Sequence, residues 1–522
     1  MTKFIFVTGG VISGLGKGVV SASLGSILQM LGENNLTVKK LDPYLNIDPG
    51  TMNPIEHGEV FVTEDGSETD LDLGYYERFL EIKTSKMNTI SSGKLLQHIL
   101  DNERKGEYLG KTVQMIPHFT NVIKDFICYN PNNCDYIICE IGGCVGDIEA
   151  MAFYEALRQL RCDLGPENTL FVHLTYLVYY SITDELKTKP TQNNIRDLQQ
   201  VGITPDILIC RTEKYMSKEI KEKLSLHTNL PVQNIIEAIN LPSIYKVPLN
   251  LVNQSVNNII CKRFQIENRI NMDKWINLNN RIEGCEKDIS IGIVGKYTEL
   301  NDSYKSLIEA LKHAGYYHNT KINIEWINGR EEKSFDLSVL NGVIIPGGFG
   351  NNGIENMITL IKDIRSLNIP VLGICLGMQL MVIEYFRNEN PKFKQSTSEE
   401  FDTDGVNVIT KMITDDNIGG SMRLGSKSIL LYPNSKVKNI YKKSIILERH
   451  RHRFSVDQHY KKYLIMNWCV SNAVTDNIIE IVELKDHPWY IGCQYHPEYS
   501  STPFEPHPLF LSFVKASLPN TM

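Results

Sequence analysis

Residues 3–18 read Lys3-Phe-Ile-Phe-Val-Thr-Gly-Gly-Val-Ile-Ser-Gly-Leu-Gly-Lys-Gly18, and this stretch determines the fold we predict for the first half of the chain. Residues 4–7 form a short apolar, β-rich run, which predicts a buried strand. Glycines dominate the next ten residues, and residues 19–31 resume with helical spacing. A strand, a glycine loop and a helix in this order bring bare backbone N–H groups to a helix N-terminus, where a polyphosphate can approach. Lys17 adds a positive charge, so the stretch predicts a phosphate-binding loop.

The loop departs from the pattern G-x-x-x-x-G-K-[ST] of P-loop proteins. Gly10 and Gly16 are one residue further apart than the pattern requires, and Gly18 stands where a hydroxyl residue would bind magnesium. A glycine-rich turn that only lets a helix pack on a strand is the structural alternative.

Length and composition indicate an ordinary globular protein with more than one domain. The chain has 522 residues, of which 42% are hydrophobic and 22% charged, enough for about two to four domains. A net charge of −7 gives no reason to expect nucleic-acid binding, and anionic substrates would need locally basic sites. We expect no membrane segment and no signal peptide. The 11 cysteines form no C-x-x-C pair, which predicts reduced thiols and a cytoplasmic location.

Strands and helices alternate over residues 1–260, and this rhythm predicts an α/β fold with a doubly wound parallel sheet. The expected strands beyond the first are residues 37–41, 136–139, 169–174 and 207–210, and the expected helices include 91–103 and 148–159, the latter with Asp147 as its N-cap.

Acidic residues in the first half are candidates for binding magnesium. Asp70 and Asp72 lie two residues apart, so on an extended segment they would point the same way. Glu140 ends a predicted strand and precedes glycines, where P-loop-like α/β folds place a metal-binding acid. Carboxylates aimed at a phosphate loop suit Mg²⁺, because hard oxygen ligands suit a hard cation. For Asp70 and Asp72 a solvated acidic loop is the alternative.

A second anion site is predicted in the segment Leu186-Lys-Thr-Lys-Pro-Thr-Gln192. Two lysines and two threonines around a proline give a compact anion-binding composition in a loop. An exposed basic turn is the alternative.

Residues 268–286 are poor in strand signal, and we expect a linker there between a first domain, 1–267, and a second domain, 287–522. The second domain restarts the alternation of strands and helices. Its expected strands are residues 289–294, 321–326 and 342–345, with a helix over about 303–314.

The strongest chemical signal is Val371-Leu-Gly-Ile-Cys-Leu-Gly-Met-Gln379. A short strand, a cysteine between close-set glycines and a helix from residue 376 are typical of a nucleophile elbow. The sharp turn exposes the sulfur of Cys375, and the helix N-terminus favours the reactive thiolate. An inert, buried cysteine is the alternative.

The partners of such a nucleophile occur later in the chain. His496 and Glu498 lie two residues apart, so strand geometry could aim a base and a carboxylate the same way. Together with Cys375 they form a triad by role. Gly347 and Gly348 would supply backbone N–H groups to an oxyanion.

These motifs resemble those of the CTP synthase family, and the second half resembles the class I (triad-type) glutamine amidotransferases. The resemblance runs nearly end to end. The segments that carry it are residues 9–18, 41–48, 57–62, 68–74, 76–79, 142–149, 187–192, 449–453 and 496–498.

The resemblance implies an N-terminal P-loop-like amidoligase domain and a C-terminal α/β glutaminase domain. It implies that ATP phosphorylates O4 of the uracil ring of UTP and that ammonia then displaces phosphate to give CTP. Glutamine hydrolysis supplies the ammonia through an internal channel, and Mg²⁺ accompanies ATP without any organic prosthetic group. CTP is the implied feedback inhibitor, GTP the implied activator, and a homotetramer, with filaments in the family, the implied assembly.

The resemblance also implies residue roles. ATP would meet Ser13, Gly14, Leu15, Gly16, Lys17, Gly18, Lys40 and Asp72, and the metal would meet Asp72 and Glu140. UTP, or CTP as inhibitor, would meet Ser13, Asp147, Ile148, Glu149, Lys187, Thr188, Lys189, Pro190, Thr191, Gln192 and Lys223. Glutamine would meet Gly348, Leu376, Gly377, Met378, Gln379, Glu400 and Arg453, and Cys375 would attack its amide carbon. Glu399 is an alternative to Glu400, His57 falls where the family gates ammonia, and Cys144 replaces the threonine usual in the family.

Two other functions fit part of the pattern. Another ATP-dependent amidotransferase, of the cobyrinic or biotin-pathway kind, would share the phosphate loop but does not call for residues 187–192 together with 147–149. A non-catalytic, filament-forming homologue should have lost Lys17, Cys375 or His496, and this chain retains all three.

Overall fold

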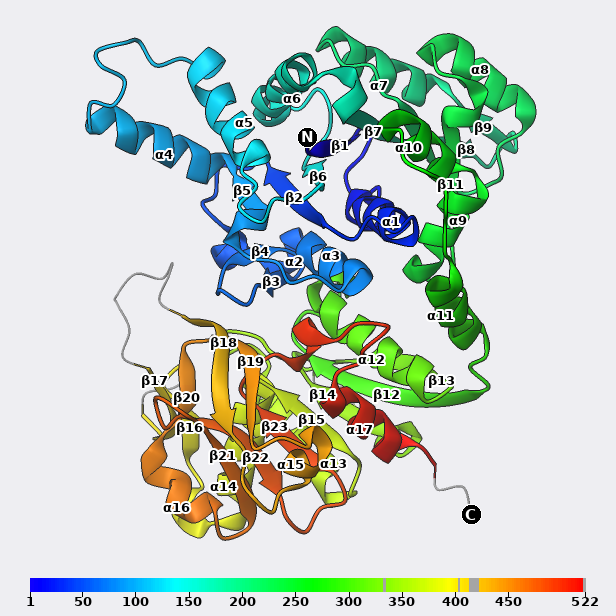
Figure 1. Cartoon of the computed structure of the whole chain (residues 1–522). Helices are drawn as coiled ribbons and strands as arrows, with labels where there is room; N and C mark the ends of the chain where they lie inside the picture. The colour runs from blue at the N-terminus through cyan, green and yellow to red at the C-terminus, as the bar shows by residue number, and fades with distance from the viewer. Residues whose placement is uncertain (332–334, 402–403, 413–421, 520–522) are drawn as a thin grey trace. The chain divides into compact units, whose positions relative to one another are not determined.

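The computed structural model describes residues 1–331, 335–401, 404–412 and 422–519 (Figure 1). The chain divides into two compact units. The first unit consists of Met1–Asp48 and Tyr75–Asn279, and the second of Pro49–Gly74 and Asn280–Met522.

The first unit is built on a parallel sheet of 7 strands in the order β11-β10-β7-β1-β6-β2-β5. The predicted doubly wound parallel sheet is therefore confirmed. Its strands are β1 (Lys3–Gly9), β2 (Leu36–Asp42), β5 (Thr89–Ser91), β6 (Tyr136–Ile141), β7 (Thr169–Tyr176), β10 (Ile207–Thr212) and β11 (Ile235–Ile239). Its helices of eight or more residues are α1 (Lys17–Met30), α4 (Ser92–Arg104), α5 (Thr120–Cys128), α6 (Met151–Leu164), α7 (Lys189–Gln200), α8 (Lys218–Thr228), α10 (Val256–Phe264) and α11 (Asp273–Glu283), with α3 (Asp72–Leu80) crossing from the other unit.

Successive side chains of the central strands point to opposite faces of the sheet, and each face packs against a layer of helices. Phe4 and Phe6 of β1 and Ile137 of β6 belong to one buried cluster with residues of α4, α5 and α6. The next residue of β6, Ile138, faces α1, where a Cβ at Gly25 would lie 3.3 Å from the Ile138 Cδ1 atom. Helices therefore cover both faces, which explains why these strands read as continuous apolar runs.

Two local predictions are corrected by this structure. Asp147 does not cap a long helix with its side chain: it precedes a 3₁₀ turn, Ile148–Ala150, and its Oδ2 accepts the backbone N–H of Cys144 at 2.6 Å. Asp70 and Asp72 do not share an extended segment, because Asp70 ends β4 (Glu68–Asp70) and Asp72 begins α3.

Residues 187–192, which were predicted to form a basic loop, instead span the end of a strand and the start of a helix. Lys187 ends β9 (Glu185–Lys187), which pairs with β8 (Val178–Tyr180), and Lys189 begins α7. The proline lies in the first turn of that helix, where its missing N–H costs no hydrogen bond.

The second unit contains a sheet of 9 strands in the order β13-β12-β14-β15-β23-β22-β21-β18-β19. The strands from β13 to β23 pair in parallel, and those from β23 to β19 are antiparallel. They are β12 (Lys287–Gly295), β13 (Thr320–Asn328), β14 (Gly342–Ile345), β15 (Val371–Ile374), β18 (Arg423–Leu430), β19 (Ile445–His452), β21 (Trp468–Ala473), β22 (Ile479–Leu484) and β23 (Tyr490–Cys493). Smaller strands are β16 (Ser396–Ser398), β17 (Val406–Lys411) and β20 (Phe454–Val456), and the helices are α12 (Lys305–Tyr317), α13 (Ile354–Ser366), α14 (Leu376–Glu389), α15 (Lys436–Tyr441), α16 (Lys461–Leu464) and α17 (Pro508–Ser517).

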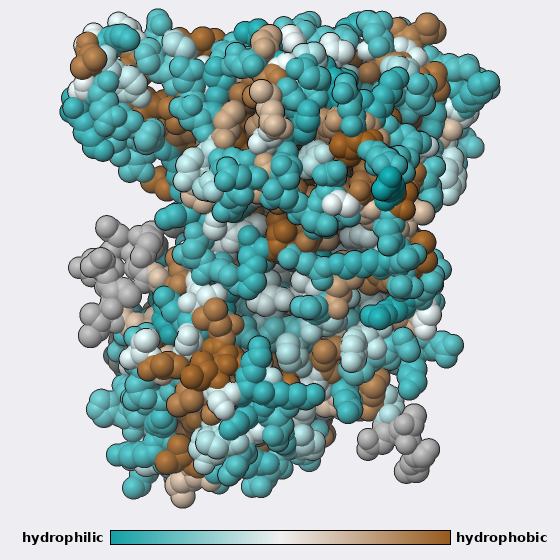
Figure 2. All heavy atoms as spheres, viewed as in Figure 1, coloured by the Kyte–Doolittle hydropathy of each residue, from teal (hydrophilic) through white to brown (hydrophobic). Residues whose placement is uncertain are grey.

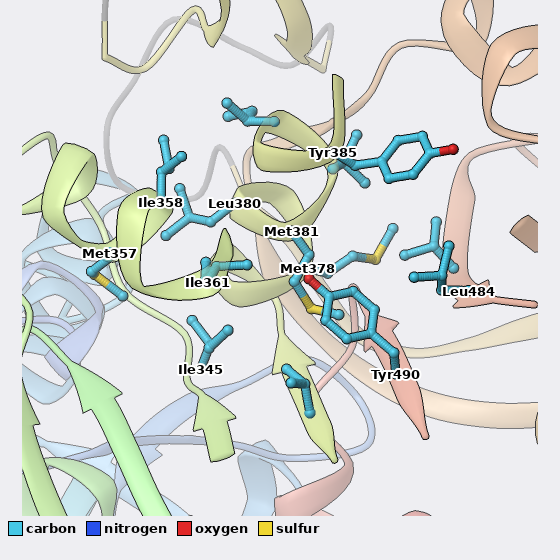
Figure 3. Close-up of a cluster of buried hydrophobic side chains, with 14 of the residues drawn as sticks. Ile345, Met357, Ile358, Ile361, Met378, Leu380, Met381, Tyr385, Leu484 and Tyr490 are labelled. Atoms are coloured by element: carbon cyan, nitrogen blue, oxygen red, sulfur yellow. The ribbon is translucent and has the colours of Figure 1, made fainter. Parts of the chain in front are cut away.

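The core of the second unit follows the two-residue period of its parallel strands. Ile344 and Leu372 belong to a cluster with residues of α12 and α17. Val343, Ile345 and Val371 belong to a second cluster with residues of α13 and α14. Figure 3 shows this second cluster, in which Met378, Leu380, Met381 and Tyr385 of α14 meet Met357, Ile358 and Ile361 of α13.

A segment from the first half of the sequence packs within the second unit. Residues 49–74 carry α2 (Pro54–His57), β3 (Val60–Val62) and β4. Glu59 Oε2 accepts the N–H and the hydroxyl of Ser306 at 2.9 and 2.6 Å, and Glu68 Oε1 accepts a hydrogen bond from Arg451 Nε at 2.8 Å. The Tyr499 hydroxyl donates to the Val60 carbonyl at 3.0 Å. These contacts hold the segment against α12, β19 and the 3₁₀ turn Pro497–Ser500, which includes Glu498 of the predicted triad.

The face drawn in Figure 2 carries mostly hydrophilic side chains, with small groups of hydrophobic ones over both units. Among the residues that the structure describes, we find no helix of sufficient length and hydropathy to cross a membrane. The segment expected as a linker, 268–286, contains α11, whose Trp275 is buried.

Candidate active site

The cysteine predicted as nucleophile lies on a tight turn between β15 and α14. Cys375 adopts φ 52° and ψ −106°, a strained conformation for a residue other than glycine. The turn needs glycines on both sides: a Cβ at Gly373 would lie 2.2 Å from the Met381 sulfur, and one at Gly377 would lie 1.9 Å from the Ile345 carbonyl oxygen. This crowding explains the spacing G-x-C-x-G.

The predicted base and its orienting acid are hydrogen-bonded to each other. His496 Nδ1 donates to Glu498 Oε1 at 2.7 Å, and both side chains are buried. The sequence predicted that strand geometry would bring these two side chains together. In the structure a 3₁₀ turn, Pro497–Ser500, brings them together instead. Among the described residues, His496 Nε2 has no hydrogen-bond partner.

The electrostatic environment makes this imidazole a strong base. Burial lowers the pKa of His496, but the Glu498 charge and the Cys375 thiol outweigh burial and raise the pKa to about 10. A histidine with a raised pKa holds a proton taken from a thiol, which is what a base for a cysteine nucleophile must do.

The triad opens into a cavity of about 70 Å³ within the second unit. The cavity is lined by Pro54, Glu59, Val60, Tyr297, Ser303, Tyr304, Leu307, Pro346, Gly347, Gly348, Phe349, Cys375, Arg451, His496, Glu498 and Tyr499. Three of these residues come from the segment 49–74, so part of the cavity wall is supplied by the first half of the sequence.

The predicted oxyanion residues lie beside the triad. A Cβ at Gly347 would lie 3.0 Å from His496 Cε1 and 3.6 Å from the Cys375 Cβ, so a side chain there would crowd the histidine. Gly348 lies beside Lys296, with its virtual Cβ 3.6 Å from the lysine Cδ.

Lys296 is a site residue that the sequence analysis missed. Its Nζ donates to the carbonyl oxygens of Phe349 and Gly350. Burial lowers its pKa to about 8, with Arg330 acting in the same direction and Glu400 opposing. A lysine after a strand is too common for its position in the sequence to have revealed it.

The two candidate glutamates for substrate binding have different surroundings. Glu400 Oε1 accepts the backbone N–H of Gly350 at 2.7 Å, next to the cavity loop. Burial raises the pKa of Glu400, while the charges of Lys296 and Arg453 act in the opposite direction. Glu399 Oε2 instead accepts the N–H of Lys411 on β17, at 2.6 Å.

Four other predicted glutamine-binding residues, 376–379, occupy the first turn of α14, whereas Arg453 lies between β19 and β20 with its guanidinium carbon 6.0 Å from the centre of the Phe349 ring. Leu376 and Met378 are buried and belong to the hydrophobic core. Gln379 Nε2 donates to the Phe454 carbonyl at 3.0 Å and to Gln494 Oε1 at 3.2 Å.

The predicted phosphate loop of the first unit has the expected form of a strand, a glycine turn and a helix. Gly14 and Gly16 adopt φ 71° and 87°, which favour glycine, and Gly16 is the N-cap of α1. Ser13 and Leu15 belong to the same turn, and Lys17 and Gly18 begin the helix. Lys17 Nζ donates to the Gly143 carbonyl at 2.5 Å.

Lys40 and Glu140 lie opposite each other on β2 and β6. Lys40 Nζ is 3.0 Å from Glu140 Oε1, and the Tyr76 hydroxyl donates to Glu140 Oε2 at 2.5 Å. Glu140 therefore offers a buried carboxylate at a strand end, as predicted. Asp72 belongs to the other unit, together with His57, whose Nε2 lies 2.8 Å from Asp70 Oδ1.

An apolar cavity of about 100 Å³ lies next to the phosphate loop. Leu15, Gly16, Arg211, Ile239 and Leu251 are among the residues that line it. The sequence analysis missed Arg211 and Ile239, although both lie at or near the ends of parallel strands, where such folds bind ligands.

Six of the predicted UTP residues line two different cavities of the first unit, whereas Ser13, Asp147 and residues 190–192 line neither of these two. Lys187, Thr188, Lys189 and Lys223 line one cavity of about 570 Å³. Ile148 and Glu149 line another of about 630 Å³. Pro190, Thr191 and Gln192 continue into α7, where Thr191 and Gln192 are buried: the Thr191 hydroxyl donates to the Tyr176 carbonyl at 3.1 Å, and Gln192 Nε2 donates to the Thr188 hydroxyl at 3.1 Å.

Comparisons with known proteins agree with both halves of this description. Residues 3–266 match the family described as CTP synthase N-terminus, and residues 299–516 match that described as Glutamine amidotransferase class-I. The chain is 49% identical to a CTP synthase of Hydrogenobaculum sp. over 98% of this chain and 97% of that one. It is 46% identical to a CTP synthase of Aquifex aeolicus over 99% of each chain. Among solved structures, the glutaminase domain of Trypanosoma brucei CTPS with bound acivicin is 33% identical, covers 44% of this chain and 93% of that one, and gives a TM-score of 0.41.

The two matched regions define an ATP-dependent ligase joined to a class I glutamine amidotransferase. The chain belongs to the CTP synthase family, enzymes that form CTP from UTP with glutamine.

Proposed function

We propose that this chain aminates UTP to CTP at the expense of ATP, and that Cys375, His496 and Glu498 release the ammonia from glutamine. The observation that carries the second part is the cavity in which the strained Cys375 meets the His496–Glu498 pair. The products are CTP, ADP, phosphate and glutamate.

In the proposed glutaminase reaction, His496 Nε2 takes the thiol proton and the sulfur attacks the amide carbon of glutamine. The Gly347–Gly348 backbone stabilises the negative oxygen of the tetrahedral intermediate. The imidazolium then gives its proton to the departing nitrogen, so that ammonia leaves and a thioester remains. Water activated by the same imidazole releases glutamate and restores the thiol.

In the proposed ligase reaction, Lys17, Lys40 and the N–H groups of residues 13–18 bind the ATP phosphates. The apolar cavity beside Leu15 and Gly16 accepts the adenine ring. Glu140 is a buried oxygen donor of the kind Mg²⁺ takes, and we assign the metal to Glu140 and Asp72. Bound Mg²⁺ supplies charge neutralisation at the transferring phosphoryl group.

We assign UTP, and CTP as feedback inhibitor, to Ser13, residues 147–149, residues 187–192 and Lys223. Lys187, Lys189 and Lys223 are placed on the triphosphate with Gln192 as a polar neighbour, and Glu149 near the ribose or base. We also propose GTP activation, a homotetramer and filament formation, on the family resemblance alone. The proposed functional division keeps an amidoligase domain at 1–267, a connection at 268–286 and a glutaminase domain at 287–522. All 11 cysteines are unpaired, which supports the proposed cytoplasmic location.

The deciding experiment incubates the purified full chain with UTP, ATP, Mg²⁺ and glutamine, or with ammonia in place of glutamine, and measures CTP. Formation of CTP from both nitrogen sources is expected. A protein that hydrolyses glutamine but leaves UTP unchanged would be another amidotransferase, and one inactive in both assays would be a non-catalytic homologue.

A further inference from the structure

We propose that Gln494 is a catalytic residue of the glutaminase, whose side-chain amide donates a hydrogen bond to the Cys375 sulfur and stabilises the thiolate before it attacks glutamine. The proposal rests on the nucleophilic role proposed for Cys375. Gln494 Nε2 lies 3.6 Å from Cys375 Sγ, and the Gln494 side chain is fully buried.

Besides its interaction with His496, the sulfur has two polar contacts of opposite character within the described part of the chain. It accepts from the Gln494 amide at 3.6 Å, and as a thiol it donates to the Arg451 carbonyl oxygen, also at 3.6 Å. Loss of the proton ends the contact with the carbonyl, whereas the N–H donor then faces a negative sulfur. A donor that binds the charged form better than the neutral form shifts the equilibrium toward the charged form. Gln494 therefore favours the thiolate.

The direction of the Gln494 amide is fixed by a chain of hydrogen bonds that begins at the main chain. The Phe454 carbonyl can only accept, so the Gln379 group 3.0 Å from it must be the NH₂. The same NH₂ lies 3.2 Å from Gln494, which must therefore present its oxygen there. The amide nitrogen of Gln494 is left on the side of the sulfur. Rotating the amide would set two donors against each other.

Strand pairing places the two residues side by side. β15 and β23 are parallel neighbours, with Ile374 opposite Cys493, so Cys375 and Gln494 are the next residues on adjacent strands. The Cys375 N–H donates to the Cys493 carbonyl at 2.7 Å, and the Gln494 N–H donates to the Glu480 carbonyl at 2.8 Å. The main chain on both sides of the N–H···S contact is therefore held by the sheet.

The other charged groups near the sulfur have different roles. His496 and Glu498 approach from the 3₁₀ turn, and His496 receives the proton. The Arg451 guanidinium is engaged by Glu68 and the Gly50 carbonyl. An amide does not titrate, so Gln494 cannot replace the base.

The test measures how fast iodoacetamide alkylates Cys375 in the full chain as a function of pH. The thiolate sulfur bonds to the CH₂ group and iodide leaves, so the rate follows the thiolate fraction. Mass spectrometry of the peptide that contains Cys375 separates it from the other cysteines. Gln494→Met removes the donor and keeps an unbranched side chain of similar size.

For Gln494→Met we expect alkylation to slow about tenfold at neutral pH, and to slow progressively less as the pH rises. A rate equal to that of the parent at every pH, or lowered by one constant factor, would overturn the proposal, because a role in shaping the turn alone does not depend on pH. Gln458→Met is the matched control: its amide donates to the Asn477 carbonyl in the same unit, and the alkylation rate should not change.

A second variant covers the case in which Gln494→Met does not fold, as judged by thermal unfolding. Gln379→Met leaves Gln494 in place but removes the donor that orients it, and we expect a slowing of about threefold at neutral pH. An unchanged rate would count against the proposal. Glutamine hydrolysis by Cys375→Ser, assayed in parallel, separates the nucleophilic role of Cys375 from the role of Gln494. Full hydrolysis by Cys375→Ser would refute the role of Cys375 as nucleophile. An inactive Cys375→Ser together with normal alkylation in Gln494→Met would refute only the role of Gln494.

Discussion

His496 Nδ1 donates to Glu498 Oε1 at 2.7 Å across a single intervening proline. This bond leaves Nε2 as the ring nitrogen that can take a proton from Cys375. Because Nδ1 is held by Glu498, the orientation of the imidazole ring is fixed before substrate binds. The base therefore needs no rearrangement of its own to accept the thiol proton.

Cys375→Ala should separate the two proposed activities. Only the thiolate attacks the amide, whereas free ammonia enters the reaction after that step. We expect glutamine-dependent CTP formation to fall by at least about a thousandfold and ammonia-dependent formation to remain. Measuring CTP with each nitrogen source tests this. Loss of both activities in a folded variant would argue against the assignment.

Glu400→Gln and Glu399→Gln form a matched pair for the glutamine site. Glu400 faces the Gly350 N–H of the cavity loop, whereas Glu399 is bonded to Lys411. A carboxylate that meets the α-ammonium group of glutamine contributes to binding, so Glu400→Gln should raise KM for glutamine by about tenfold or more. Glu399→Gln should leave KM near the parent value. The opposite order of effects would assign the site to Glu399.

Lys17→Ala should abolish CTP formation from either nitrogen source. The lost charge stabilises the transferring phosphoryl group, and we expect a decrease on the order of a hundredfold or more. Basal glutamine hydrolysis should persist and serves as the folding control. CTP formation from ammonia at a near-parent rate would show that the loop does not bind the ATP phosphates.

Much of the fold could be predicted because its signals are local. The apolar run 4–7, the glycines after it and the restart at residue 289 each mark a strand of a parallel sheet. The packing of residues 49–74 within the second unit could not be predicted, because it depends on contacts such as Glu59 with Ser306, which are far apart in the sequence. Short-range patterns also misassigned Asp147, since its carboxylate bonds to the Cys144 N–H rather than to a helix end.

The same distinction holds for the site. Cys375, His496 and Glu498 were predictable because a nucleophile elbow and a closely spaced His–Glu pair have sequence signatures. Lys296 and Gln494 have none: the sequence does not reveal that the lysine donates to the Gly350 carbonyl or that the glutamine amide lies beside the Cys375 sulfur. Sequence patterns therefore predicted the groups that we propose react, and the sheet was needed to find the groups that we propose assist them.

Lys187→Ala should weaken both the use of UTP and the inhibition by CTP. The two nucleotides share the triphosphate and differ only at ring position 4, so lysines that bind the triphosphate cannot distinguish them. Lys187, Lys189 and Lys223 line one cavity, and each lost contact with a phosphate should change affinity by about tenfold or more. The measurement is a UTP saturation curve with and without CTP. If Lys187→Ala raises the UTP concentration needed for half-saturation but leaves inhibition by CTP unchanged, then inhibitor and substrate use different sites.

Glu498→Gln should make the stability of the protein less dependent on the protonation of His496. Burial lowers the pKa of this histidine, but Glu498 and Cys375 outweigh burial and raise it from 6.5 to about 10. A raised folded-state pKa means that the folded state binds the proton more tightly than the unfolded state. The resulting stability is fully present below about pH 6.5 and is lost as the pH rises toward about 10. Removing the Glu498 charge removes most of this contribution.

The melting temperature of Glu498→Gln should therefore lie furthest below that of the parent near pH 6, and the gap should narrow by about pH 9.5. Glu505→Gln, at an exposed acid of the same unit, should show no such trend. A gap for Glu498→Gln that is constant or widens with pH would contradict the raised pKa.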